Sequence, residues 1–448
     1  MKTALMALLI LFACFAAAGC AQEKPPEANR IKVMYSGSEQ QFFREYGNYF
    51  AAKFPDLDVD LVSTAGISSG PEEGNEYEKR VVTENPDLVV LNSHSYTELA
   101  GRGILLDLSP FIQRDHFDID HIAPAVVDYL SSAAGDGKLY GIGPNFSSNV
   151  LLYNKDLFKL YGVPEPEGSM SWEQFYTIMH HFSVTNVSHE RVYGYHRPFV
   201  TNPFSFVQEI ANSSGLTFVN TVTRQITIDT EGWRKAFRLV SDSIMDGSLG
   251  GGYRGMGAQG HIGEADMRNA DLFGQGKAAM TTANFSSVNK LVANPPPFQW
   301  GIAGSPGPQA SIGMSSGMDV FPIFAIYAKA EHSETAWRVL QYLNSDEVAR
   351  FNSGLQTGYL PARRQYAPDL AHHDIDLFYR VADSRRNTAL LMADFYALPE
   401  AFQKVLGTVI LEEFDAVLDG KTTVDKAVQR MQERLQVALD YSVAAEAD

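Results

Sequence analysis

Strand-like and helix-like segments alternate along the chain from residue 30, and this alternation constrains the fold more than any other feature. Residues 31–35 form an apolar strand pattern, residues 57–62 alternate like a half-buried strand, and residues 88–91 form a short apolar run. Between the first two strands, aromatic side chains recur at helical spacing from Phe42 to Phe54, and Pro55 ends that helix. This succession predicts an α/β fold, in which helices cover both faces of a sheet.

The loops that follow the strands are the first places to look for a binding site. In α/β sheets, ligands bind beyond the carboxyl ends of the strands. Ser36 follows the first predicted strand, and Asn92 and His94 follow the third. We therefore expect Ser36, Asn92 and His94 to contact a ligand, although a solvated loop imidazole would explain His94 equally well.

The N-terminus has the features of a bacterial export signal. One basic residue, Lys2, precedes an apolar run over residues 4–16, which is shorter than the about 20 residues that span a bilayer. The segment 17–20 (AAGC) resembles the bacterial lipobox, apart from Ala17 in place of leucine. We expect a signal peptide over 1–19, a lipid such as palmitate on Cys20, and a flexible tether over 20–29. The alternative is an ordinary signal peptide, with Cys20 incidental.

Composition narrows the classes of partner. The two cysteines, Cys14 and Cys20, both belong to the N-terminal signal region, so the exported domain has no disulfide and depends on its hydrophobic core. The net charge of −17 argues against nucleic acid or an anionic lipid surface as a partner. The histidine pairs at 180–181 and 372–373 are adjacent residues, which point apart on a helix. We therefore expect no metal site and no cofactor.

Four segments after the signal region carry recognisable motifs. They are residues 86–112 with PDLVV and LLDLSPFI, residues 137–175 with GKLYGI, LYNKDLF, GVP and SWEQF, residues 273–280 (FGQGKAAM), and residues 336–363 with AW, LNS and TGYLPAR. In this order and spacing they cover most of the chain after the signal region. Together they resemble the family 1 extracellular solute-binding proteins, the group that contains the maltose-binding protein.

The resemblance implies a periplasmic-binding-protein-like fold of type II. In this fold, two α/β lobes are joined by a multi-strand hinge, and the ligand cleft lies between them. The chain is expected to cross between the lobes near 143–148, 317–321 and 344–347. Lobe 1 is expected over 30–145 and 321–344, and lobe 2 over 146–320 and 345–448.

The resemblance also directs attention to polar and aromatic residues near the crossovers, because a sugar site needs flat rings and hydrogen-bonding groups. Phe285 follows the FGQGKAAM segment, where relatives commonly present a tryptophan; it keeps a stacking face but lacks the indole N–H. Packing is the alternative for the residues of the first crossover. The candidates are Asn145, Phe146 and Ser147 at the first crossover, Tyr195, Asn284, Phe285 and Ser286 in lobe 2, Met318 at the second crossover, and Tyr359.

These features predict an exported, membrane-anchored, monomeric protein that captures a solute outside the cytoplasm. The expected solute is a carbohydrate or oligosaccharide, delivered to the transmembrane subunits of an ABC permease. The alternatives are an exported lipoprotein enzyme acting on glycans, and a binding protein for a polyamine or ferric ion. Glycoside hydrolysis needs two carboxylates that face one bond. The sequence shows no such catalytic setting, so we expect no enzymatic activity.

Overall fold

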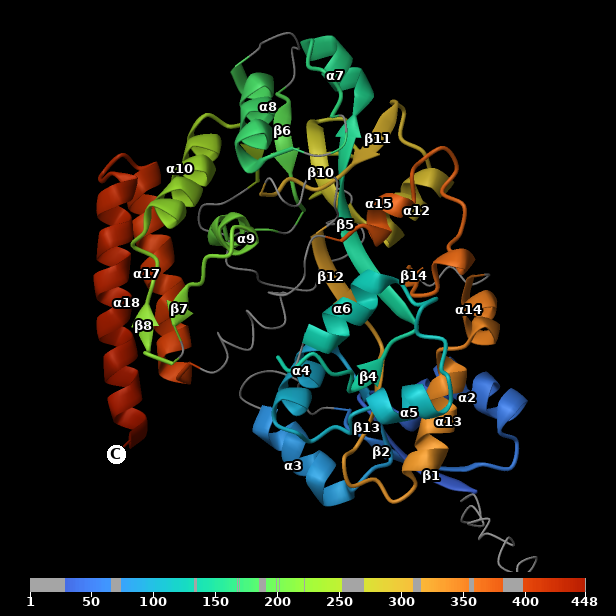
Figure 1. The fold of residues 1–448 in the computed structure, drawn as a ribbon. Coiled ribbons are helices and arrows are strands. Elements are labelled where there is room, and N and C mark those ends of the chain that lie inside the picture. Colours follow the sequence, from blue (N-terminus) through green and yellow to red (C-terminus); the bar gives the residue numbers. More distant parts are fainter. Residues whose placement is uncertain are drawn as a thin grey trace, which may run out of the picture.

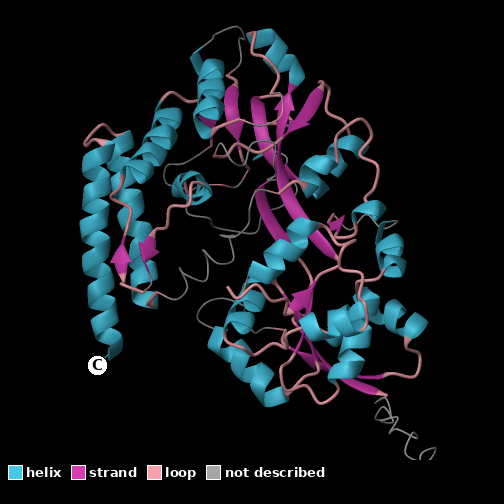
Figure 2. Ribbon diagram, in the orientation of Figure 1, coloured by secondary structure: helices cyan, strands magenta, loops and turns pink. Residues whose placement is uncertain are grey.

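In the computed structural model, two large sheets flanked by helices form the described part of the chain (Figures 1 and 2). This architecture confirms the predicted α/β class. None of the helices in this part is long and apolar enough to cross a membrane. The structure describes residues 29–65, 74–132, 135–166, 168, 170–184, 191–198, 200, 202–220, 222–251, 270–308, 316–353, 358–381 and 398–447.

The first sheet contains the N-terminal strands, in the order β2-β1-β3-β13-β4. These strands are Asp58–Ser63, Arg30–Tyr35, Leu88–Leu91, Ile323–Ile326 and Gly141–Ile142. The strand β1 pairs in parallel with β2 and β3, whereas β13 runs antiparallel to β3 and β4. The accompanying helices are α2 (Glu39–Lys53), α3 (Gly74–Glu84), α4 (Ser93–Gly101), α5 (Ser109–Arg114), α6 (Pro124–Ser132) and α13 (Ser333–Leu343). We call this sheet and its helices the first lobe.

The helix α2 shows how the local sequence builds this lobe. Ser38 is its N-cap and accepts a hydrogen bond from the Gln41 N–H through its side chain. Phe42, Tyr46 and Phe50, spaced one helical turn apart, are buried. The ring of Tyr46 packs edge-on against Phe324 of β13. The aromatic spacing therefore predicts this helix correctly.

The second sheet is built around the long strand β5 (Asn145–Asn154). Its order is β11-β5-β10-β6-β9, and β12 and β14 also pair with β5. Those strands are Trp300–Ala303, Ala278–Asn284, Tyr193–His196, Leu249–Gly250, Ser316–Val320 and Leu360–Pro361. The surrounding helices are α7 (Lys155–Tyr161), α8 (Trp172–Val184), α9 (Phe204–Ser213), α10 (Glu231–Met245), α12 (Phe285–Ala293), α14 (Asp346–Ser353) and α15 (Asp376–Tyr379), with a 3-10 turn at Arg364–Tyr366. We call this part the second lobe.

The lobes are connected where the chain passes from one sheet to the other. It leaves the first sheet after β4 and enters β5, and it returns between β12 and β13. A further passage lies between α13, which contacts β13 and β1, and α14, which contacts β14. In the described chain, these passages fall between Ile142 and Asn145, between Val320 and Ile323, and between Leu343 and Asp346.

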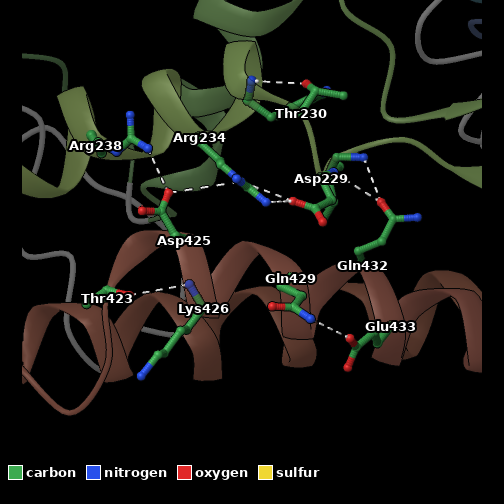
Figure 3. A network of polar contacts seen from close by, with 12 residues as sticks. Asp229, Thr230, Arg234, Arg238, Thr423, Asp425, Lys426, Gln429, Gln432 and Glu433 are labelled. Carbon is green, nitrogen blue, oxygen red and sulfur yellow. Dashed lines mark hydrogen bonds and ion pairs between the residues drawn. The ribbon is translucent and has the colours of Figure 1, made fainter.

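A helical hairpin completes the second lobe. It consists of α17 (Glu400–Leu418) and α18 (Val424–Ala447), joined by a turn in which Gly420 has a φ of 70°. The buried side chains Val428, Met431, Leu435 and Leu439 recur at helical spacing along α18, so this helix is amphipathic. Figure 3 shows polar side chains of α18 that contact α10 and the residues that precede α10. Arg238 pairs with Asp425 at 2.7 Å, and the Gln432 side chain accepts hydrogen bonds from the N–H groups of Ile228 and Asp229.

Candidate functional site

The side chains at the start of β5 alternate between two environments. Because successive strand residues point to opposite faces, every second residue shares a face. The partly exposed residues are Asn145, Ser147 and Asn149, and the buried ones are Phe146, Ser148 and Val150. The first half of β5 therefore has one polar face and one covered face.

The covered face of β5 lies against α15. The Ser148 hydroxyl donates to the backbone oxygen of Phe378 at 2.7 Å, and the ring of Phe146 packs edge-on against Tyr379. Phe146 is 0% exposed, and Met318 of β12 is 6% exposed. Strand alternation thus turns the side chains of Phe146 and Met318, both of them candidate ligand contacts, into the core.

The opposite face carries the polar side chains of both hinge strands. We call Asn145, Ser147, Asn149 and Asp319 the hinge polar face. Asp319 of β12 lies directly opposite Ser147 in the antiparallel pair with β5, so these two side chains share a face. Gly317 lies beneath the Asn149 amide, because a Cβ at Gly317 would come within 2.4 Å of Asn149 Nδ2.

The first lobe contributes a hydroxyl to this face. Ser93, the first residue of α4, donates from Oγ to Asp319 Oδ1 at 2.5 Å, and the Tyr129 hydroxyl hydrogen-bonds Ser93 in turn. Burial raises the pKa of both Tyr129 and Asp319. Yet the residue Asp319 as a whole is exposed to solvent. Together these observations describe a carboxyl group that water reaches but protein atoms largely surround.

Ser36, Asn92 and His94 lie at the carboxyl edge of the first sheet. The strands β1 and β3 are parallel, so the residues that follow them lie on one edge, and Ile323 at the start of β13 pairs with Leu91 there. Asn92 Oδ1 caps α4 by accepting a hydrogen bond from the Ser95 N–H at 2.8 Å. His94 is partly exposed, and burial lowers the pKa of its imidazole.

The end of β10 reaches the same region from the second lobe. Asn284 pairs with Asn149 of β5, and its side chain caps α12 by accepting a hydrogen bond from the Ser287 N–H at 3.0 Å. Phe285, the first residue of α12, is 4% exposed and packs edge-on against Phe378. The structure therefore makes Phe285 a core residue and corrects the expectation of an exposed stacking ring.

The two tyrosine candidates have different environments. Tyr195 is 4% exposed and its hydroxyl is hydrogen-bonded to Thr282 at 2.7 Å, so it too belongs to the core, against expectation. Tyr359 is 37% exposed. The neighbouring Gly358 lies against Ser286, since a Cβ at Gly358 would lie 3.0 Å from Ser286 Oγ. Tyr359 is thus the aromatic candidate that presents its ring to solvent, beside the partly exposed Ser286.

The chemistry of these groups is that of hydrogen-bonded recognition. Amides, hydroxyls and one carboxyl group converge where the lobes are joined. Within the described ranges, no group of three or more histidine, cysteine, aspartate or glutamate residues could hold a metal ion. The predicted lipid site, Cys20, lies outside the described residues.

Comparison with known proteins decides the family. A family model described as bacterial extracellular solute-binding protein matches residues 36–350, well over half of the chain. The chain belongs to this family. It is a solute-binding protein for ABC transport and not an enzyme.

Relatives agree with this assignment. The chain is 26% identical over 389 residues to a binding protein of Brucella abortus strain 2308, with 82% of each chain covered. It is 23% identical over 375 residues to the sn-glycerol-3-phosphate-binding periplasmic protein of Brucella melitensis, with 77% of this chain and 78% of the relative covered. The sugar-binding protein MalE of Xanthomonas citri superimposes with a TM-score of 0.62 at 19% identity, covering 94% of this chain and 99% of that one. The last likeness confirms the periplasmic-binding-protein-like fold.

Sequence reasoning missed two residues of the solute-binding protein's hinge region: Asn149 and Asp319. Ser93 stands between Asn92 and His94, in a loop that the sequence already indicates as a candidate. A signal for Asn149 was present, because Asn145, Ser147 and Asn149 repeat with the period of a strand. A signal for Asp319 was also present, because it is the acidic residue of the crossover segment 317–321. The contact between Ser93 and Asp319 joins residues 226 positions apart, and no local pattern predicts it.

Proposed function

We propose that this protein captures a carbohydrate or oligosaccharide at the hinge polar face and delivers it to the transmembrane subunits of an ABC permease. The observation that carries the proposal is the set of partly exposed amides, hydroxyls and a carboxyl group where the lobes are joined. Sugar hydroxyls both donate and accept hydrogen bonds, so such groups suit them. The exposed ring of Tyr359 supplies an apolar surface for a sugar face.

The proposed cleft lies between lobe 1 (30–145 and 321–344) and lobe 2 (146–320 and 345–448). Ser36, Asn92 and His94 would contact the ligand from the first lobe, and Asn284, Ser286 and Tyr359 from the second. Asn145 and Ser147 would form the floor of the cleft. The name of the Xanthomonas relative, a sugar-binding protein, supports the proposed ligand class.

The mature protein is proposed to be a monomer held to the membrane by a lipid on Cys20, with 20–29 as its tether. The sequence of the signal region supports the lipid on Cys20 and the tether. A tethered binding protein stays close to its permease, which raises the effective concentration at which the two meet.

A thermal-shift screen tests the ligand class. A ligand at 100 times its dissociation constant adds about 2.7 kcal/mol to the free energy of unfolding. We expect one or more neutral di- or oligosaccharides to raise the melting temperature, and polyamines and ferric ion to leave it unchanged. A shift with a polyamine or ferric ion alone would refute the carbohydrate proposal. New reducing ends after incubation with oligosaccharides would instead indicate a hydrolase.

A further inference from the structure

The carboxyl group of Asp319 occupies a central place in the hinge polar face. It lies on β12 opposite Ser147, and Ser93 of the first lobe donates to one of its oxygens at 2.5 Å. The backbone N–H of Val320 also hydrogen-bonds the carboxylate. A carboxylate has about four acceptor positions. Ser93 and Val320 occupy two of these positions, so Asp319 retains others for a ligand.

The charge of Asp319 has no cationic partner among the described residues. The influences on its pKa are burial, the Ser93 hydroxyl and the Val320 N–H, with no lysine or arginine of the described chain among them. An uncompensated carboxylate attracts hydroxyl donors and repels anions, and the repulsion is stronger where protein replaces water. A charge in this setting favours a neutral solute over an anionic one.

The position of Asp319 also affects the adjacent helix. The N-terminus of a helix attracts anions, including phosphate groups. At α4 the first residue, Ser93, already donates to the Asp319 carboxylate, and the Asn92 side chain caps the helix. The carboxylate of Asp319 thus places a negative charge beside the first residue of α4, at the end of the helix that attracts anionic groups.

We propose that Asp319 is the residue that makes this protein select uncharged polyhydroxy solutes and reject their phosphate esters. This inference rests on the proposed function, because it assigns the charge selectivity of the same site. The carboxylate accepts hydrogen bonds from the hydroxyls of a neutral sugar or polyol. A phosphate ester brought to the hinge polar face meets the same carboxylate as a like charge, without a described cation to offset it.

Calorimetric titration of the full mature chain with matched ligand pairs tests the inference. The pairs are glucose with glucose 6-phosphate, maltose with maltose 1-phosphate, and glycerol with sn-glycerol 3-phosphate. We expect the wild type to bind a neutral member at least tenfold more tightly than its ester. Asp319→Asn should lower that ratio at least tenfold. The matched control is Asp128→Asn, which removes an exposed carboxylate from α6 and should leave the ratio unchanged. Equal or tighter binding of an ester by the wild type, or an unchanged ratio in Asp319→Asn, would overturn the inference.

Inorganic phosphate provides a second readout that does not depend on the sugar. Phosphorus-31 NMR line broadening should show no phosphate binding by the wild type and measurable binding by Asp319→Asn, since the substitution removes the negative charge beside the first residue of α4. Phosphate binding by the wild type, or by neither protein, counts against the inference. If no neutral ligand binds the wild type, the proposed function fails, while the phosphate measurement still decides the role of Asp319.

Discussion

At the scale of single residues, Phe285 is the position where the sequence-based prediction, a stacking ring in the cleft, differs most from the structure. Its ring is 4% exposed and packs against Phe378, so truncation should create a cavity. We expect Phe285→Ala to lower the free energy of unfolding by about 3–5 kcal/mol. The affinity of the folded fraction for its sugar should change little. Thermal melts and calorimetric titration of the same variant measure both quantities.

The control for Phe285 is an exposed ring of the same type. Phe43 is 42% exposed on α2, so Phe43→Ala should change the free energy of unfolding by only about 0.5 kcal/mol. A Phe285→Ala variant that keeps its stability but loses affinity about thirtyfold would restore the stacking role.

Single residues also show how much of the candidate site can be predicted from the sequence alone. Asn145 and Ser147 were recognisable from their residue types at a crossover, and the structure places them on the polar face of β5. Phe146 lies between them, and the period of a strand sends it to the opposite face. Asp319 acquires its setting from Ser93, which the fold brings from a distant helix. Local periodicity therefore predicts which face a side chain takes once the strand is known, but not which distant residue it meets.

At the scale of elements, α18 stabilises a neighbouring segment through its glutamine side chains. Gln432 accepts hydrogen bonds from the N–H groups of Ile228 and Asp229, at 3.0 and 3.1 Å (Figure 3). Gln432→Ala leaves these two donors without that partner, so we expect a loss of about 1–3 kcal/mol in the free energy of unfolding. Urea denaturation measures the change.

Gln429, one turn earlier on the same helix, is the matched control. It is exposed and bonds Glu433 of its own helix. Gln429→Ala should therefore change stability by about 0.5 kcal/mol or less. Equal effects of the two substitutions would show that the loss comes from helix propensity and not from the contact with residues 228–229.

Strands and helices were predicted better than the contacts between them. The residues of β1, β2 and β3 follow from their apolar periodicity, and the start of α8 follows from Ser171 and Gln174, which form reciprocal hydrogen bonds as a capping box. The short strands β7 (Val219–Asn220) and β8 (Gln225–Ile226) have no such signal. The N–H of Ile226 instead bonds the Gln436 side chain of α18, which only the tertiary fold supplies.

At the scale of the whole molecule, the proposed lipid on Cys20 should decide where the protein resides in the cell. Cys20→Ala removes the thiol that would be acylated, and no other cysteine follows it in the chain. We expect the variant to move from the membrane fraction to the soluble fraction, as shown by fractionation and immunoblotting. Cys14→Ala, within the predicted signal peptide, is the control and should stay with the membrane. Membrane association that survives Cys20→Ala would contradict the anchor.

The arrangement of the two lobes predicts closure around the ligand. The proposed contacts from Asn92 and His94 belong to the first lobe, and those from Asn284 and Ser286 to the second. A ligand that contacts all four residues links the two lobes, so we expect the lobes to approach when it binds. The bond between Ser93 and Asp319 lies where the lobes are joined, and we expect it to persist during the motion.

Small-angle scattering measures this closure directly. The radius of gyration should fall on saturation with the sugar that gives the largest thermal shift, because the outer parts of both lobes move inward about the hinge strands. A sugar that gives no thermal shift should leave the radius unchanged. An unchanged radius with the bound sugar would mean that the lobes are already in their final positions. Binding would then depend on the hinge polar face alone, and substitutions of Asn92 and Asn284 should leave the affinity intact.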